Sequence, residues 1–241
     1  MPFFHKPNLE MTTAILVAAG RGTRMGPDVD KLFLEVGGTP IVAHTWRCLD
    51  RSPEIDHVVL VIRPDLESSF RDLARAHVHP SKPWSLTGGG PERQDSVANG
   101  LAAVPSGTTL VAIQDGARPC TSLLTLQRCL DSAQRSGASV AAQRAVDTIK
   151  ESNGGSTIAR HLDRSRLWTV QTPQCFRLEI IRRALAAVHE KGLLITDDTA
   201  ACDLIGQPVE LVECADPNPK VTTPGDLPWI DLLLHGANTA R

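Results

Sequence analysis

A glycine-rich segment near the N-terminus has the composition of a phosphate-binding loop. Residues 18–26 (AAGRGTRMG) follow the apolar run 14–18, and Lys31 comes shortly afterwards. Glycines let the backbone approach a ligand closely, and exposed N–H groups bind phosphate oxygens, while Arg24 and Lys31 add positive charge. Neither standard motif fits, because Met25 stands where a dinucleotide fingerprint needs glycine and the chain has no Gly-Lys-Ser/Thr. The segment predicts a nucleotide-phosphate site of another kind, with a purely structural glycine turn as the alternative.

A second glycine-rich bend and a carboxylate indicate the same chemistry. Residues 88–96 (GGGPERQDS) lead into a predicted helix, and such a bend suits close backbone contact with a flat base. Residues 114–119 (QDGARP) follow the apolar run 110–113, so Asp115 would lie at the carboxyl end of a strand. A carboxylate there can hold Mg²⁺ bound to phosphates. The alternative is an ion pair between Asp115 and Arg118 that shapes the turn, and the two roles are compatible.

Apolar, β-branched runs alternate with segments of helical period along the chain. The predicted strands are 14–18, 57–62, 110–113, 139–142 and 209–212. Helices are predicted after Pro40, after Ser122 as an N-cap, over about 180–188, and from near Asp226. This alternation predicts an α/β fold, a Rossmann-like and mostly parallel sheet with helices on both faces. Ligands of such sheets bind at the carboxyl ends of the strands, where the glycine segments and Asp115 fall.

Residues 147–174 depart from this alternation. Asn153-Gly154-Gly155 is a turn signal between two polar arms that can form strands, so the stretch predicts a β-hairpin arm over about 147–172. A lone two-stranded ribbon is barely stable in water, so we expect the arm to pack on a partner, and a second copy of the chain is the obvious one. A long surface loop is the alternative.

The composition excludes several classes of protein. The 241 residues include 25 Lys and Arg against 27 Asp and Glu, and 41% are hydrophobic. This balance argues against a protein that coats nucleic acid or a membrane, and no apolar run approaches the roughly 18 residues of a membrane helix. The first ten residues lack the apolar stretch of a signal peptide, so we expect a cytoplasmic protein with a tail over 1–10 and one domain over 11–235. The six cysteines form no CxxC pair, which predicts buried, reduced thiols.

Several motifs, taken in order, match one family. These motifs are AAGRGTRMG with the following DK, GGGPERQDSV, QDGARP, DTIK, DRSRLW, TPQ, ITDD and NPKVTTPGDL. In order and spacing they resemble the 2-C-methyl-D-erythritol 4-phosphate cytidylyltransferases of the non-mevalonate isoprenoid pathway. The resemblance covers about residues 12–235 and implies the nucleotide-diphospho-sugar transferase type of α/β fold. The first motif alone indicates only a nucleotidyltransferase, whereas the arm, TPQ and the lysine before VTTP make the match more specific.

The resemblance implies a reaction and a set of site residues. The family joins CTP to methylerythritol phosphate with Mg²⁺, giving CDP-methylerythritol and pyrophosphate, and its arm reaches across a homodimer. Arg24 and Lys31 would stabilise the transition state. The residues implied to position the polyol phosphate are Arg164, Lys220, Asp147, Thr148 and Thr196. The residues implied to bind the nucleotide are Ala18, Ala19, Gly20, Gly22, Gly90, Ser96, Asp115 and Arg118, of which Asp115 would also lie next to the metal.

Three positions depart from the pattern of the family. Gln114 stands where histidine is common, and Gly116 stands where alanine is common. Pro91, which has no backbone N–H, stands in the base-contacting loop where some relatives have an acidic residue. Losing one neutral hydrogen bond costs on the order of 1 kcal/mol, which is too little to abolish binding.

Two other functions stay open on the sequence. One is a cytidylyltransferase for another polyol phosphate, such as ribitol 5-phosphate, which would use the same triphosphate machinery and differ between Asp147 and Arg164. The other is a nucleotide-binding protein without turnover. The presence of both Arg24 and Lys31 argues against the second, because a binding protein has less need of a lysine at the scissile phosphate.

Overall fold

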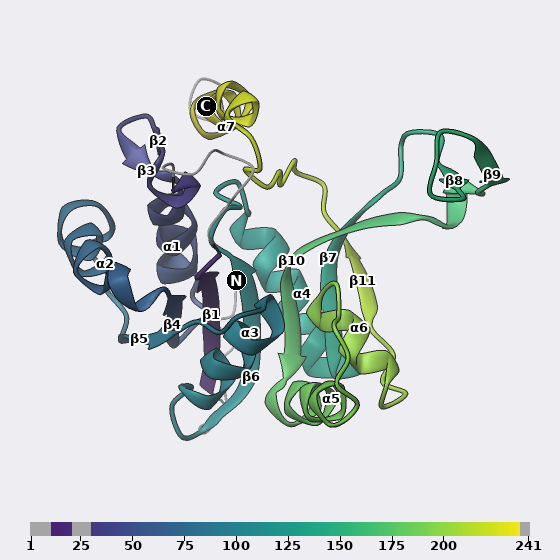
Figure 1. The fold of residues 1–241 in the computed structure, drawn as a ribbon. Helices are drawn as coiled ribbons and strands as arrows, with labels where there is room; N and C mark the ends of the chain where they lie inside the picture. The colour runs from purple at the N-terminus through teal and green to yellow at the C-terminus, as the bar shows by residue number, and fades with distance from the viewer. Residues whose placement is uncertain (1–10, 21–29, 237–241) are drawn as a thin grey trace, which may run out of the picture.

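The centre of the molecule is a seven-stranded sheet (Figure 1). The computed structural model describes residues 11–20 and 30–236. The strand order is β11 (Glu210–Glu213), β7 (Ala138–Arg144), β10 (Trp168–Arg177), β6 (Thr108–Asp115), β1 (Met11–Ala18), β4 (His57–Ile62) and β5 (Trp84–Gly88). Neighbouring strands run parallel except at β10, which is antiparallel to both β6 and β7. The predicted mostly parallel sheet is confirmed, and it contains all five predicted strands.

Helices cover both faces of this sheet, as predicted. On one face lie α1 (Ile41–Arg51), α2 (Glu67–Leu73) and α4 (Leu123–Ser136), which share a core with Leu16 of β1. On the other face lie α3 (Arg93–Ala102), α5 (Leu178–Glu190) and α6 (Asp198–Asp203), which share a core with Ile15. Successive side chains of a strand point to opposite faces, so one fully buried strand serves both cores. The last helix, α7 (Leu227–Gly236), joins the first core through Ile230.

Local sequence explains where the helices begin and how closely they pack. The hydroxyl of Ser122 accepts the N–H of Thr125, so the predicted N-cap of α4 is confirmed. The final helix begins after the 3₁₀ turn Pro224–Asp226, close to the predicted start. In α3, an added Cβ at Gly100 would lie 2.6 Å from Ile15 Cγ2, so glycine lets this helix approach the sheet.

Two strands of the sheet, β5 and β10, are absent from the sequence-based expectations. Every residue of β5 is only partly buried, as suits its place at the edge. Strand β10 contains Pro173, which cannot donate to the ladder, and its register against β7 shifts between Val170 and Gln174. Both strands therefore lack the continuous apolar run that marks a buried parallel strand.

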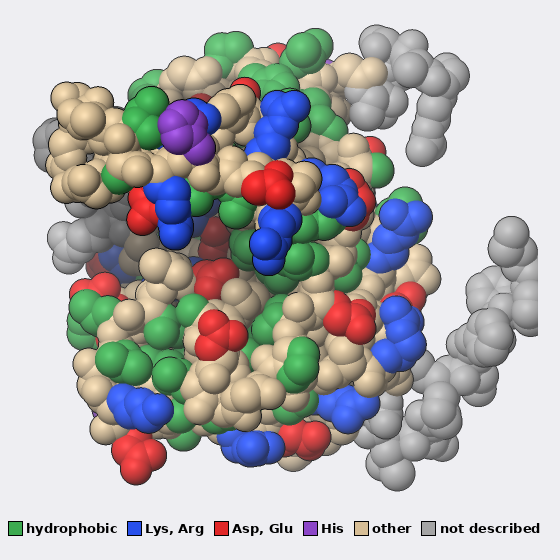
Figure 2. All heavy atoms as spheres, turned by 90° about the vertical axis from the view of Figure 1, so that its right-hand side faces the viewer, with side chains coloured by type: hydrophobic (Ala, Val, Ile, Leu, Met, Phe, Trp, Pro, Cys, Tyr) green, Lys and Arg blue, Asp and Glu red, His purple; other side chains and the backbone are tan. Residues whose placement is uncertain are grey.

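The predicted hairpin arm is confirmed. Its strands β8 (Lys150–Ser152) and β9 (Ile158–His161) pair antiparallel, and every residue of both is exposed. The arm extends away from the sheet beyond β7 and β10 (Figure 1), and the surface is hollowed beneath it (Figure 2). The chain rejoins the sheet at Trp168, so the arm ends there rather than at about residue 172. At its base the Arg144 guanidinium lies over the Trp168 ring, 4.4 Å from the centroid.

The remaining expectations concern thiols, membranes and the N-terminus. All six cysteines are free, and only Cys48 and Cys120 are less than fully buried. In the part of the chain that the structure describes, no helix is both long and apolar enough to cross a membrane. The predicted tail over 1–10 lies outside the described residues, as do Gly22 and Arg24.

Candidate active site

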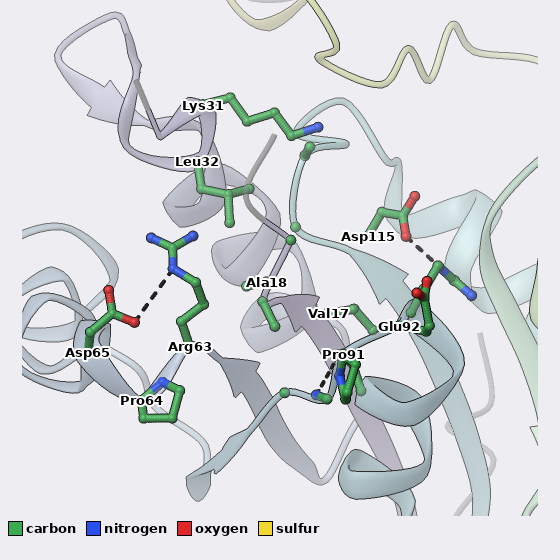
Figure 3. Close-up of a pocket in the computed structure, with 18 of the residues that line it drawn as sticks. Val17, Ala18, Lys31, Leu32, Arg63, Pro64, Asp65, Pro91, Glu92 and Asp115 are labelled. Carbon is green, nitrogen blue, oxygen red and sulfur yellow. Dashed lines mark hydrogen bonds and ion pairs between the residues drawn. The ribbon is translucent and has the colours of Figure 1, made fainter. Parts of the chain in front are cut away.

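A cavity of about 620 Å³ opens at the carboxyl ends of β1, β4, β5 and β6. In Figure 3, Lys31 and Leu32 lie over this cavity, with Arg63 and Asp65 on one side and Asp115 on the other. Segments far apart in the sequence meet here: the end of β1, the segment after β4, the glycine bend, the end of β6 and the lysine of NPKV. This is the place that the α/β pattern predicts for a ligand.

The glycine bend forms one wall of the cavity through backbone contacts. The N–H of Gly89 donates to the carbonyl of Ile62 at 2.7 Å, and the N–H of Gly90 donates to the Ser96 hydroxyl at 3.0 Å. A Cβ at Gly89 would lie 2.2 Å from the Ala19 Cβ, so a residue with a side chain would push the bend away from β1. The wall is therefore mainly backbone, which a flat base can contact closely.

Charge is concentrated around Asp115 at the end of β6. Its Oδ2 lies 2.7 Å from Lys220 Nζ and 3.8 Å from Arg118 Nε, and its Oδ1 lies 3.5 Å from Arg93 Nη2. Burial would raise the pKa of Asp115, but these three cations outweigh it and hold the pKa below its usual value. The expected pair with Arg118 is present, although the contact with Lys220 is much shorter. An ionised carboxylate thus lines the cavity.

A second carboxylate, that of Asp198, lies behind Arg93. Its Oδ2 is 2.8 Å from Arg93 Nη1, and the residue is fully buried. Its Oδ1 has no hydrogen-bond partner among the described residues. Burial raises the pKa of Asp198 to about 6, although Arg93 opposes the rise. Arg93 therefore joins a carboxylate that lines the cavity to one that water does not reach.

Lys31 is held from two directions at the rim of the cavity. Asp30 caps the 3₁₀ turn Lys31–Phe33 and also accepts a hydrogen bond from Arg63 Nη2 at 2.8 Å. Lys31 Nζ donates to the carbonyl of Val221 at 3.0 Å. The lysine that follows the first glycine segment is thereby brought next to the C-terminal NPKV segment.

A buried polar network ties TPQ and ITDD to this site. Thr172 accepts the N–H of Asp115 on its hydroxyl at 3.1 Å, and its carbonyl accepts from Asn218 Nδ2 at 2.8 Å. Gln174 Nε2 donates to Asp197 Oδ2 at 3.2 Å. The motifs that are separated in the sequence therefore form one connected structure around Asp115.

Comparison with known proteins decides the family. A model of the family IspD, 2-C-methyl-D-erythritol 4-phosphate cytidylyltransferase, matches residues 12–235. The chain belongs to this family. Proteins with that name from Geobacillus kaustophilus and Desulforamulus reducens are 42% and 38% identical to the chain. These two matches cover 92% and 93% of the chain and 96% of each relative.

Solved structures of cytidylyltransferases of this family have the same fold. The 4-diphosphocytidyl-2C-methyl-D-erythritol synthase of Anaerococcus prevotii superposes with a TM-score of 0.83 at 26% identity, covering 94% of this chain and 96% of that one. The 2-C-methyl-D-erythritol 4-phosphate cytidylyltransferase of Thermus thermophilus gives 0.74 at 31% identity, covering 92% and 98%. The nucleotidyltransferase type of α/β fold is confirmed.

The structure brings most of the residues implied by the cytidylyltransferase family to the cavity. Those that line it are Ala18, Ala19, Gly20, Lys31, Gly90, Ser96, Asp115 and Lys220. Arg118 lies beside them, where its Nη1 donates to the carbonyl of Asn218 at 2.6 Å. The predicted roles of Gly22 and Arg24 concern positions outside the described residues.

The residues implied to position the polyol phosphate are divided between the body and the arm. Asp147, Thr148 and Arg164 are exposed and belong to the arm, and none of them is among the described residues that line the cavity. Arg164 Nη1 instead donates to the carbonyl of Val146 at 2.6 Å. Thr196 is exposed in the loop before α6. One copy of this cytidylyltransferase does not bring Arg164 and Lys220 to the same cavity.

The three departures from the family pattern have different surroundings. Gln114 is fully buried outside the cavity, where its Nε2 donates to the Thr121 hydroxyl at 3.0 Å. Gly116 lines the cavity, and a Cβ there would lie 3.2 Å from the Val17 carbonyl oxygen, which is tighter than ordinary contact. Pro91 also lines the cavity, so the missing N–H is at the site itself.

Three further residues of the site, Arg63, Arg93 and Asp198, were not identified from the sequence. Arg93 and Asp198 fall inside the motifs GGGPERQDSV and ITDD, but nothing in the sequence places these two motifs against each other. Arg63 directly follows the predicted strand 57–62. The position after a strand's carboxyl end is the one signal that could have found it.

Proposed function

We propose that this protein transfers CMP from CTP to 2-C-methyl-D-erythritol 4-phosphate. Its relatives are named 2-C-methyl-D-erythritol 4-phosphate cytidylyltransferases. A phosphate oxygen of the polyol phosphate attacks the α-phosphorus of CTP. The bond from that phosphorus to the bridging oxygen breaks, and pyrophosphate leaves with the electron pair. The observation that carries the proposal is the meeting of the family's motifs around one cavity, lined by both basic and acidic side chains, at the carboxyl ends of the strands.

The reaction requires little proton transfer to or from the protein. The attacking phosphate is already largely dianionic at neutral pH, so the chain has to position two polyanions in line and neutralise the charge that builds up at the α-phosphate. Lys31 Nζ lies at the cavity rim for this second task. Lys220, which pairs with Asp115, is proposed to leave it and bind the phosphate of the incoming polyol. Arg24 is proposed to act with Lys31.

The residues present fit a magnesium ion held by one protein carboxylate and the phosphates of the nucleotide. Asp115 lines the cavity, and its neighbouring cations keep it ionised. Among the described residues no cluster of three or more His, Cys, Asp or Glu side chains forms a separate metal centre. When bound, the ion supplies positive charge to the triphosphate.

We propose a homodimer in which the arm of one copy completes the cavity of the other. The arm and its base expose Val146, Ile158 and Val170, which are 82%, 54% and 40% accessible. Both strands of the arm are also exposed along their length, and an isolated ribbon of this kind is marginal in water. Packing against a second copy would cover this apolar surface and bring Arg164 to a site that contains Lys220.

The experiment that tests the function is pyrophosphate release by the purified protein. CTP and Mg²⁺ are supplied with methylerythritol phosphate or ribitol 5-phosphate in parallel. Release with methylerythritol phosphate alone is expected. Release with ribitol phosphate alone would overturn the proposed substrate and keep the transfer of CMP. CTP binding without release in either assay would instead support a nucleotide-binding protein.

We propose that this reaction takes place in the cytoplasm.

A further inference from the structure

Arg93 and Asp198 contact the site, but the reaction described above gives them no task. Arg93 is the first residue of α3, directly after the glycine bend, and Asp198 is the first residue of α6 on the same face of the sheet. Arg93 makes a 2.8 Å pair with Asp198 and a 3.5 Å pair with Asp115. One planar guanidinium thus connects a fully buried carboxylate to a carboxylate that lines the cavity.

Stability gives no reason for a carboxylate at position 198. Moving an ion pair out of water costs free energy. The attraction between the two charges offsets this cost only when their remaining hydrogen-bonding positions are satisfied. Here Oδ1 has no hydrogen-bond partner among the described residues. Burial raises the pKa of this carboxyl to about 6, so the folded environment disfavours the charge. The carboxylate is therefore better explained by its effect on Arg93.

Arg93 and Lys220 are attached to Asp115 in different ways. Lys220 carries one compact ammonium on a flexible stem, and its proposed task takes it from Asp115 to the polyol phosphate. Arg93 presents a rigid fork, and Asp198 holds one of its two terminal nitrogens. The other terminal nitrogen consequently remains directed at Asp115 whichever partner Lys220 takes.

We propose that Asp198 is a positioning residue, which fixes the Arg93 guanidinium so that it stays on Asp115 when Lys220 moves to the polyol phosphate. This inference rests on the proposed function. Asp198 acts through Arg93 and touches neither substrate. Arg93 keeps Asp115 oriented, so Asp115 faces the nucleotide in the same way at every stage.

The test compares Asp198→Asn with Asp203→Asn, the same change at an exposed position at the end of α6. Mg²⁺-dependent CTP binding is measured by calorimetry, and kcat/KM is measured by pyrophosphate release. We expect Asp198→Asn to lower both at least tenfold without lowering the melting temperature. Asp203→Asn should match the wild type. Full CTP binding and turnover in Asp198→Asn would overturn the proposal.

Two further variants separate positioning from a structural role. Arg93→Lys keeps the charge but cannot span both carboxylates, so it should lose activity as Arg93→Met does. Adding Asp198→Asn to Arg93→Met should change kcat/KM less than twofold, because the residue through which Asp198 acts is already gone. A full tenfold loss in that background would also overturn the proposal. If the wild type uses ribitol phosphate alone, the proposed substrate fails, and these comparisons are made with ribitol phosphate.

Discussion

The cavity wall and the arm hold their charged residues in opposite ways. At the cavity, Arg93, Asp115 and Asp198 form a chain of contacts that is mostly buried. On the arm, Arg160 and Glu151 pair at 2.7 Å, but their side chains are 69% and 50% accessible. An exposed pair of this kind contributes about 0–1 kcal/mol, whereas a buried pair stabilises the fold only when its remaining hydrogen-bonding positions are satisfied.

This difference indicates which parts of the site one chain can build alone. The nucleotide end is organised by contacts within the copy, from the glycine bend to the carboxylates. The arm holds Arg164 exposed and outside the lining of its own copy's cavity, so its geometry depends on what it packs against. Substitutions at the cavity should therefore change chemistry or stability in one chain, while substitutions on the arm should chiefly change the use of the polyol phosphate.

The largest effect is expected at Lys31. Lys31→Ala should lower kcat at least 100-fold and change the Kd for CTP less than threefold, because the ammonium acts on charge that develops in the transition state. Pyrophosphate release and calorimetry measure the two quantities. Lys191→Ala, at the exposed end of α5, is the matched control and should behave as the wild type. Equal losses of CTP affinity and kcat would mean that Lys31 only binds the nucleotide.

Arg164 tests the role of the arm. Arg164→Ala should lower kcat/KM for the polyol phosphate about 10- to 100-fold and leave CTP binding unchanged, because it removes one charged contact to a phosphate. Mixing it with Lys31→Ala should restore activity, since a mixed dimer contains one site in which both residues are intact. Absence of recovery after subunit exchange has been verified would show that each site is built from a single chain.

The sequence could predict features that depend on neighbouring residues, but not contacts between distant ones. The five strands, the N-cap at Ser122 and the turn of the arm depend on residues close together in the chain, so periodicity and turn chemistry were enough. The cavity's location followed from the fold class. The contacts of Lys31 with Val221 and of Arg93 with Asp198 join residues more than a hundred positions apart, and only the tertiary fold decides them. The resemblance to a family supplied residue roles that no local pattern contains.

A pair of glycines extends the comparison to the backbone. Gly89→Ala should destabilise the protein by about 1–3 kcal/mol and weaken CTP binding, because its Cβ would meet Ala19 at 2.2 Å. Gly155 on the arm has open space around it and no positive φ, so Gly155→Ala should change stability by less than about 0.5 kcal/mol. Urea unfolding measures both. Equal losses of stability in Gly89→Ala and Gly155→Ala would contradict the tight packing inferred at the cavity wall.

The smallest effect expected is a pH dependence of stability that arises at Asp198. Its pKa of about 6 in the folded protein lies above the usual value of 3.8, so the folded state binds this proton more tightly than the unfolded state does. The stability contributed by the protonated group is complete below about pH 4 and is lost as the pH rises through about 6. Asp198→Asn carries no such charge, so it should be about 1–3 kcal/mol more stable than the wild type at pH 8 and equal to it near pH 4.

Urea unfolding from pH 4 to pH 8 measures this difference, and Asp163→Asn provides the contrast on the arm. Hydrogen bonds from Ser165 lower the pKa of Asp163, so any stability it contributes is present above its usual pKa and is lost as the pH falls. At pH 8 the two variants should therefore differ from the wild type in opposite directions, with Asp198→Asn more stable and Asp163→Asn less stable, and both differences should shrink toward pH 4. A wild type that is more stable than Asp198→Asn at pH 8 would mean that attraction to Arg93 outweighs burial. A variant that is more stable yet less active would identify Asp198 as a carboxylate kept for the geometry of the site.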